Sequence, residues 1–169
     1  MAEDDDIIMT LAPSIGRRVL GAGSLAALGV VLLSLVFEAE GLWSAVFLVV
    51  AILVLLAAQR LWTATADRLE LTRHELRTGS GRVLTPLENV ESVDRGAFAF
   101  KPSNGFLVKL TRPAGAGWSP GLWWQRGRLL GVGGVVRGGE ARAMAELISA
   151  HKDGTLEMII EARNAPPPD

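Results

Sequence analysis

The residues best suited to chemistry in this chain are its two histidines, His74 and His151. Neither has a second metal-ligating residue near it in the sequence. The chain also has no cysteine, which excludes a zinc site built on thiolates. His151 closes a segment with helical spacing, where a cation suits the negative end of the helix dipole. We therefore expect both histidines to be structural, and no metal is predicted.

Two other patterns could suggest catalysis. Glu88 and Glu91 are spaced for one face of a helix, but two carboxylates alone do not define a glycosidase. The run GVGGVVRGG at 131–139 has neither the lysine and serine of a phosphate-binding loop nor the acidic residue expected after a dinucleotide-binding turn. The sequence therefore predicts no catalytic residue and no cofactor, and the protein is expected not to be an enzyme.

The remaining candidates lie in WSPGLWWQRGR, residues 118–128, which holds three of the five tryptophans. Tryptophan beside arginine is typical of protein contacts and of membrane interfaces, although tryptophan also packs in cores. Core packing, a protein partner and a lipid surface all remain open for this stretch. The candidate contact residues are Trp118, Trp123, Trp124, Arg126 and Arg128.

Two uncharged apolar runs, residues 19–37 and 42–58, precede this stretch and are separated only by EAEG. A membrane-spanning helix needs roughly 17–25 apolar residues, and neither run has the polar stripe of a soluble helix. We therefore expect a transmembrane helical hairpin. Because neither run contains an ionisable side chain, a transporter or channel is not indicated.

Charges and aromatic residues at the ends of the runs predict the orientation. Basic residues flank the hairpin, whereas its turn carries two glutamates and no lysine or arginine. The positive-inside rule then places both termini in the cytoplasm, and tryptophan is expected at the interfaces. The predicted interfacial anchors are Arg17, Arg18, Trp43, Arg60 and Trp62.

Small residues spaced by four recur in the first run, and such residues let helices approach closely. They could pack the first helix against the second or dock a partner's transmembrane helix, and both interpretations stay open. The predicted packing residues are Ala22, Gly23, Ala26 and Ala27.

Residues 66–152 read as a mainly β domain. RLELTRHELRT alternates apolar and polar residues, with Leu69 and Leu71 followed by Leu76 after a local shift. This pattern predicts a strand containing His74, and GSG at 79–81 predicts a turn. Residues 97–100 and 106–111 read as the arms of a hairpin joined by a Ser-Asn-Gly turn. A final segment has helical spacing, with one face formed by Ala141, Met144, Ala145 and Ile148.

The order of LELTRHELRTGSGRV, TPLENVESV and LLGVGGVVRGGEARAMAELI resembles the bacterial pleckstrin-homology-like (PH-like) domains that follow paired transmembrane helices in small membrane proteins. The resemblance covers roughly residues 66–151. It implies a curved, barrel-like antiparallel sheet capped by a C-terminal helix, and a binding or scaffolding role without a reaction. The tryptophan-containing insert departs from the simplest form of this pattern, which leaves the number of strands open.

The expected fold class is thus a membrane α-helical hairpin plus an α+β, mainly β, PH-like domain. The expected organisation is a cytoplasmic segment at 1–18, the hairpin at 19–58, the domain at 66–152, and a C-terminal extension with a proline-rich tail at 153–169. Within the extension, TLEMIIEAR could be a short strand or a helix.

The charge of the domain points to its surroundings. Residues 66–152 carry 13 Lys and Arg against 8 Asp and Glu, a net charge of +5. Beneath an anionic leaflet each basic residue contributes roughly 1 kcal/mol, which suggests membrane lipid as one partner. Nucleic acid is not indicated, because no nucleic-acid-binding motif is present.

The sequence favours a non-catalytic accessory protein in the bacterial inner membrane. Its domain would bind an integral membrane complex, as an assembly factor or supernumerary subunit of an energy-transducing complex. The alternative is a lipid- or ligand-sensing module that meets the anionic leaflet through Trp123, Trp124, Arg126 and Arg128.

Overall fold

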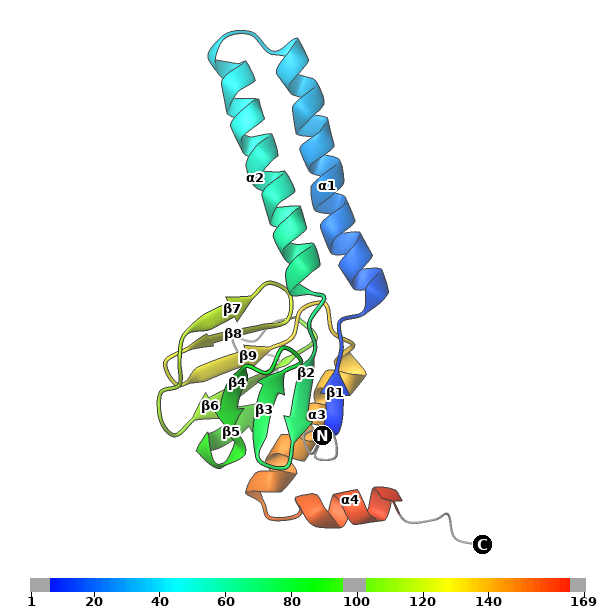
Figure 1. Cartoon of the computed structure of the whole chain (residues 1–169), viewed down its shortest axis with the longest axis vertical. Helices are drawn as coiled ribbons and strands as arrows, with labels where there is room; N and C mark the ends of the chain where they lie inside the picture. Colours follow the sequence, from blue (N-terminus) through cyan, green and yellow to red (C-terminus); the bar gives the residue numbers. More distant parts are fainter. Residues whose placement is uncertain (1–6, 96–102, 165–169) are drawn as a thin grey trace, which may run out of the picture.

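The computed structural model describes residues 7–95 and 103–164. Two long helices stand on a β-rich domain (Figure 1). Helix α1 runs over Ile15–Glu38 and α2 over Leu42–Ala64, and they pack as an antiparallel pair. Gly41 sits in the turn between them with φ +58°, a conformation that favours glycine. The predicted helical hairpin is confirmed.

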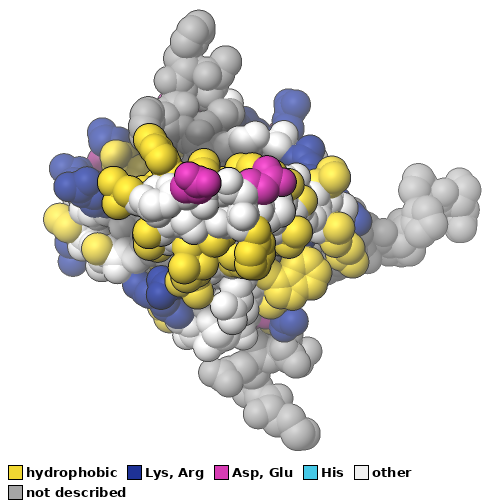
Figure 2. All heavy atoms as spheres, turned by 90° about the horizontal axis from the view of Figure 1, so that it is seen from above, with side chains coloured by type: hydrophobic (Ala, Val, Ile, Leu, Met, Phe, Trp, Pro, Cys, Tyr) yellow, Lys and Arg dark blue, Asp and Glu magenta, His cyan; other side chains and the backbone are white. Residues whose placement is uncertain are grey.

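Both helices are long and apolar enough to cross a membrane. At 1.5 Å per residue each is about 35 Å long, against about 30 Å for a bilayer's hydrocarbon core. Only 11% of the apolar window in each helix is buried. Figure 2, which looks down on the hairpin, shows its hydrophobic side chains facing outward. The protein therefore leaves most of the hairpin's apolar surface uncovered, unlike a helix in a soluble core.

The first sheet has four antiparallel strands in the order β1-β2-β3-β4. They are β1 (Ile7–Leu11), β2 (Leu69–Thr72), β3 (Glu75–Thr78) and β4 (Val83–Pro86). Strand β1 precedes the hairpin in the sequence, yet it pairs with β2, which follows it, and Leu11 lies opposite Leu69. Part of the N-terminal segment therefore belongs to the β-rich domain, and the hairpin is inserted between two neighbouring strands.

The prediction of one strand across RLELTRHELRT is wrong, because the chain turns at Arg73 and His74. The hydroxyl oxygen of Thr72 accepts hydrogen bonds from the backbone N–H groups of His74 and Glu75, at 3.3 and 3.0 Å. Such side-chain bonds favour a turn over a continuing strand. His74 therefore lies in the turn between β2 and β3. The GSG turn at 79–81, between β3 and β4, is confirmed.

The second sheet has five antiparallel strands in the order β5-β6-β9-β8-β7. They are β5 (Val90–Asp94), β6 (Phe106–Leu110), β7 (Gly117–Ser119), β8 (Trp123–Arg126) and β9 (Leu129–Val132). Of the predicted hairpin, the arm at 106–111 is β6, whereas the arm at 97–100 lies outside the described residues. The tryptophan-containing insert supplies β7 and β8, which answers the open question of the strand count.

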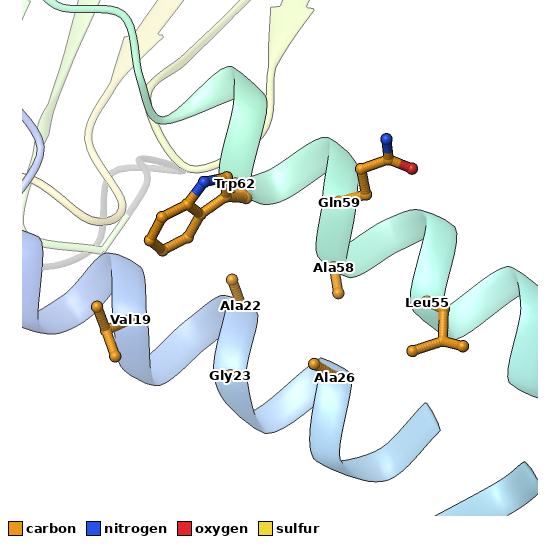
Figure 3. Close-up of a pocket in the computed structure, with 8 residues that line it drawn as sticks. All are labelled: Val19, Ala22, Gly23, Ala26, Leu55, Ala58, Gln59 and Trp62. Atoms are coloured by element: carbon orange, nitrogen blue, oxygen red, sulfur yellow. The ribbon is translucent and has the colours of Figure 1, made fainter. Parts of the chain in front are cut away.

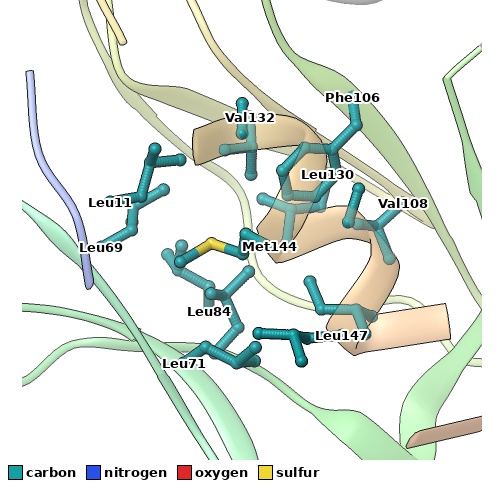
Figure 4. Close-up of a cluster of buried hydrophobic side chains, with 14 of the residues drawn as sticks. Leu11, Leu69, Leu71, Leu84, Phe106, Val108, Leu130, Val132, Met144 and Leu147 are labelled. Carbon is teal, nitrogen blue, oxygen red and sulfur yellow. The ribbon is translucent and has the colours of Figure 1, made fainter. Parts of the chain in front are cut away.

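Helix α3 (Gly138–Lys152) closes the domain. The four residues predicted for its inner face, Ala141, Met144, Ala145 and Ile148, are all buried. Figure 4 shows Met144 among leucines and valines from both sheets. TLEMIIEAR forms a helix, α4 (Leu156–Asn164), rather than a strand, and the tail at 165–169 lies outside the described residues. A helical hairpin joined to a β-rich domain with a closing helix is therefore the fold class.

Direct bonds hold the domain against the base of the hairpin. The backbone N–H of Ser14 donates to Val135 O at 2.8 Å, and Arg17 Nη1 donates to Val136 O at 3.1 Å. On the other helix, Ser119 Oγ donates to Ala64 O at 3.4 Å. The bonds at the start of α1 go to the segment between β9 and α3, and the bond at the end of α2 goes to β7, so the base of each helix is tied to the domain.

Candidate partner and membrane contact site

Strands β7 and β8 sort the three tryptophans of the candidate stretch onto two faces. Trp118 lies directly opposite Trp124, and Ser119 lies opposite Trp123. Directly opposed residues share a face, and neighbours along a strand alternate between faces. Trp118 and Trp124 therefore lie together on the outer face of the sheet, and Trp123 lies on the inner face.

Trp123 belongs to the core, with 5% of its surface exposed. The guanidinium of Arg82 lies 5.0 Å from its ring centroid. Beside it, the buried Gln125 donates from Nε2 to Leu84 O at 2.8 Å, which ties β8 to β4 of the other sheet. For Trp123, core packing is the alternative that the structure supports.

Trp118 and Trp124 form the outward aromatic pair. Trp118 is 71% exposed, and Trp124 is half-buried. Opposite Trp124 in β9 is Gly131, and a Cβ atom there would collide with the Trp124 ring. Gly131 thus leaves space for the indole to lie flat on the sheet. Arg126, two residues beyond Trp124, is exposed on the same face and forms no ion pair among the described residues.

Arg128 is engaged elsewhere. Its Nε donates to Leu110 O at 2.8 Å, and its Nη2 bonds Glu91 Oε2 at 2.9 Å. Lys109 Nζ bonds the other Glu91 oxygen at 2.6 Å. The hydrogen bond from Lys109, assisted by both positive charges, lowers the pKa of Glu91. Arg128 therefore stabilises the sheet, and the five candidate residues do not form a single surface.

The structure instead brings Trp118 next to Arg60, which no spacing in the sequence could have indicated. A notch of 400 Å³ lies where the end of α2 meets β7 and the loop after it. We call it the Arg60–Trp118 notch, and its lining residues are Arg60, Thr63, Ala64, Trp118 and Pro120. In Figure 1, β7 is the strand of its sheet nearest the hairpin. A predicted anchor and a predicted contact residue thus share one site.

A second hollow lies between α1 and α2 (Figure 3). It measures 410 Å³, and its lining residues are Val19, Ala22, Gly23, Ala26, Leu55, Ala58, Gln59 and Trp62. Among the predicted packing residues, Ala22 is buried and Ala26 is half-buried, whereas Gly23 and Ala27 are exposed. Ala22 and Ala26 line the space shared with α2. The other interpretation, docking of a partner's helix, stays a prediction.

A tight contact between the two helices lies at Gly29, a residue that the sequence did not single out. A Cβ atom at Gly29 would lie 2.5 Å from Leu55 Cδ2. Gly29 lies three residues after Ala26 and so continues the same helical face, which is the signal that could have found it.

The other predicted anchors are placed at the two ends of the hairpin. Trp43, at the end near the turn, is 66% exposed, and its ring centroid lies 6.5 Å from that of Phe47. At the domain end, Arg17 bonds Val136 and Arg18 stacks on Trp62. Aromatic residues thus mark both ends of α2.

Within residues 7–95 and 103–164, no three His, Asp or Glu side chains are grouped to hold a metal ion. His74 lies in its turn, and His151 lies near the end of α3. Comparison with protein-family models, curated proteins and solved structures gives no match. The function must therefore be inferred from the surfaces that this chain presents.

Proposed function

We propose that the protein is a non-catalytic accessory protein of the bacterial inner membrane. In this proposal α1 and α2 span the bilayer, and the β-rich domain binds a partner membrane complex from the cytoplasmic side. The observation that carries the proposal is the pairing of Trp118 with Trp124 on the outer face of a sheet that is bonded to the base of the hairpin.

The charges at the two ends of the hairpin support the orientation. Arg17, Arg18 and Arg60 lie at the end that carries the domain, and Glu38 and Glu40 lie at the turn. The domain end of the hairpin carries three arginines, whereas the turn carries no lysine or arginine. By the positive-inside rule, this difference favours a cytoplasmic domain. Both termini would then be cytoplasmic.

The outward tryptophan pair suits a protein contact. Tryptophan and arginine are enriched among the residues that dominate binding energy at interfaces. Trp118, Trp124 and Arg126 share one face, and the junction with the hairpin fixes the height of that face above the bilayer. The partner would therefore be a membrane protein whose cytoplasmic surface lies close to the bilayer, as in an energy-transducing complex that uses an assembly factor or supernumerary subunit.

A PH-like identity for the domain is part of the proposal. Two antiparallel sheets closed by a helix support it, as does the core shared by both sheets and α3. The resemblance implies binding rather than a reaction. The alternative of a lipid- or ligand-sensing module relied on Trp123 and Arg128 among its contacts with the leaflet. It is less well supported, because Trp123 is buried and Arg128 is bonded to Glu91.

The test is photo-crosslinking in native membranes, with a photoreactive amino acid in place of Trp124. We expect a crosslink to one integral membrane protein. The matched control is the same amino acid at Glu88, which is exposed but lies outside the second sheet and should give no such crosslink. Equal crosslinking from both positions, or recovery of the uncrosslinked chain alone, would contradict the proposal.

A further inference from the structure

We propose that the Arg60–Trp118 notch binds the phosphate headgroup of an anionic phospholipid in the leaflet next to the domain. This inference rests on the part of the proposed function in which the hairpin spans the membrane. It does not depend on the partner complex.

The depth of the notch matches a lipid headgroup. The uncharged run of α2 ends at Ala58, and Arg60 is the first charged residue after it. At 1.5 Å per residue, Arg60 lies about 3 Å beyond the end of the apolar run. A side chain at this depth lies where the hydrocarbon core gives way to the headgroup layer.

Of the three arginines at the domain end of the hairpin, Arg60 is the one whose guanidinium is available to a ligand. Arg17 donates to Val136 O, and Arg18 donates to Trp62 O and stacks on its ring. Among the described residues, the guanidinium of Arg60 has no hydrogen-bond or ion-pair partner, and its side chain is exposed. A guanidinium can bind two phosphate oxygens at once, which makes arginine well suited to this group.

The other walls of the notch fit a lipid rather than a soluble anion. Within the described part of the chain no carboxylate lines the notch, so none of these lining residues repels a phosphate. Trp118, 71% exposed, presents an indole beside Arg60, and such rings favour the interface between headgroups and acyl chains. Thr63 adds a hydroxyl group, and Pro120 and Ala64 add apolar surface. One cation beside an amphipathic ring and apolar walls is suited to a phosphate that carries acyl chains.

The experiment uses the full chain in mild detergent, with equal amounts of phosphatidylglycerol and phosphatidylethanolamine, and native mass spectrometry to count the bound lipids. We expect the wild-type protein to retain phosphatidylglycerol preferentially. Arg60→Ala should lower this preference about fivefold. One basic residue contributes roughly 1 kcal/mol near an anionic surface, and a tenfold change in a binding constant corresponds to about 1.4 kcal/mol. Arg60→Lys should keep most of the preference, and Trp118→Ala should weaken retention of both lipids.

The matched control is Arg126→Ala. Arg126 is exposed, has no ion-pair partner within residues 7–95 and 103–164, and lies at the end of the β7–β8 pair away from Ala64. Its substitution should leave the lipid preference unchanged. Equal losses from Arg60→Ala and Arg126→Ala would overturn the site in favour of diffuse charge. Excess inorganic phosphate should not displace the lipid; if it does, the notch takes a soluble anion and the lipid assignment is wrong. The crosslink from position 124 is scored separately, so failure of the lipid site and failure of partner binding are distinguishable.

Discussion

The guanidinium of Arg18 lies over the indole of Trp62, 4.0 Å from the ring centroid, and Arg18 Nη2 donates to Trp62 O at 2.8 Å. The two residues join the domain-side ends of α1 and α2. Both helices are bonded to the β-rich domain at this same end. The base of the hairpin is therefore held by contacts between the helices as well as by the domain beneath them.

This contact predicts a measurable coupling. In a double-mutant cycle of Arg18→Ala and Trp62→Ala, we expect a coupling of about 0.5–2 kcal/mol in the free energy of unfolding, the range of a cation–π contact. The bond to the Trp62 carbonyl survives Trp62→Ala, so the coupling reports the ring. The measurement is reversible unfolding in detergent. Replacing Arg18→Ala by Arg60→Ala in the cycle is the control and should give no coupling; an uncoupled Arg18–Trp62 pair would refute the contact.

The close approach at Gly29 predicts that a single methyl group there disturbs the hairpin. Gly29→Ala places its Cβ 2.5 Å from Leu55 Cδ2, so the helices must move apart or Leu55 must shift. Overpacking of this kind costs about 1–3 kcal/mol, which should lower the thermal unfolding midpoint. Gly23→Ala is the matched control, because a Cβ at Gly23 meets nothing within 4 Å. Adding Leu55→Ala should restore part of the loss in Gly29→Ala, and an unchanged midpoint for Gly29→Ala alone would contradict the packing.

The two faces of the β7–β8 pair predict losses of stability of very different size for Trp123 and Trp118. Trp123→Ala removes a side chain that is 5% exposed and should cost about 3–5 kcal/mol of folding stability. Trp118→Ala removes one that is 71% exposed and should change stability by less than about 0.5 kcal/mol. Chemical unfolding of both variants measures the difference. Similar losses would show that the strand register is wrong.

The ion pairs of Glu91 predict a dependence of stability on pH. Because the hydrogen bond from Lys109 and the charge of Arg128 lower the pKa of Glu91 below its ordinary value of 4.5, its ionised form favours the folded state. This contribution is present above pH 4.5 and is lost as the pH falls through the lower folded-state pKa.

The measurement compares unfolding midpoints of the wild type and Glu91→Gln from pH 7 to pH 3. The gap between the two should narrow below pH 4.5. Glu88→Gln is the control, since Glu88 is exposed and forms no ion pair among the described residues, and it should follow the wild type throughout. If the gap between the midpoints widened toward low pH, protonation of Glu91 would favour the folded state, which would contradict a stabilising role for its ion pairs.

The hairpin could be predicted from the sequence because its signal is local. Two uncharged runs of sufficient length with a four-residue polar break specify two long helices, whatever surrounds them. The inner face of α3 could also be predicted from the sequence, because helical periodicity alone brings four apolar residues to one side: Ala141, Met144, Ala145 and Ile148. The turn at His74 was not predicted, although the apolar positions shift in phase between Leu71 and Leu76, because a local hydrogen bond to the Thr72 hydroxyl decides the break.

Long-range pairing decided the rest. Strand β1 joins β2 across the whole hairpin, and Leu11 becomes fully buried, although nothing within residues 7–11 identifies its partner. Composition marked WSPGLWWQRGR as a contact stretch, but only the register of β8 against β7 and β9 separates the buried Trp123 from the outward Trp118 and Trp124. A shift of one residue would exchange these faces. The Arg60–Trp118 notch exists for the same reason: its two named residues come from distant segments, and the packing of β7 against the end of α2 is what brings them together.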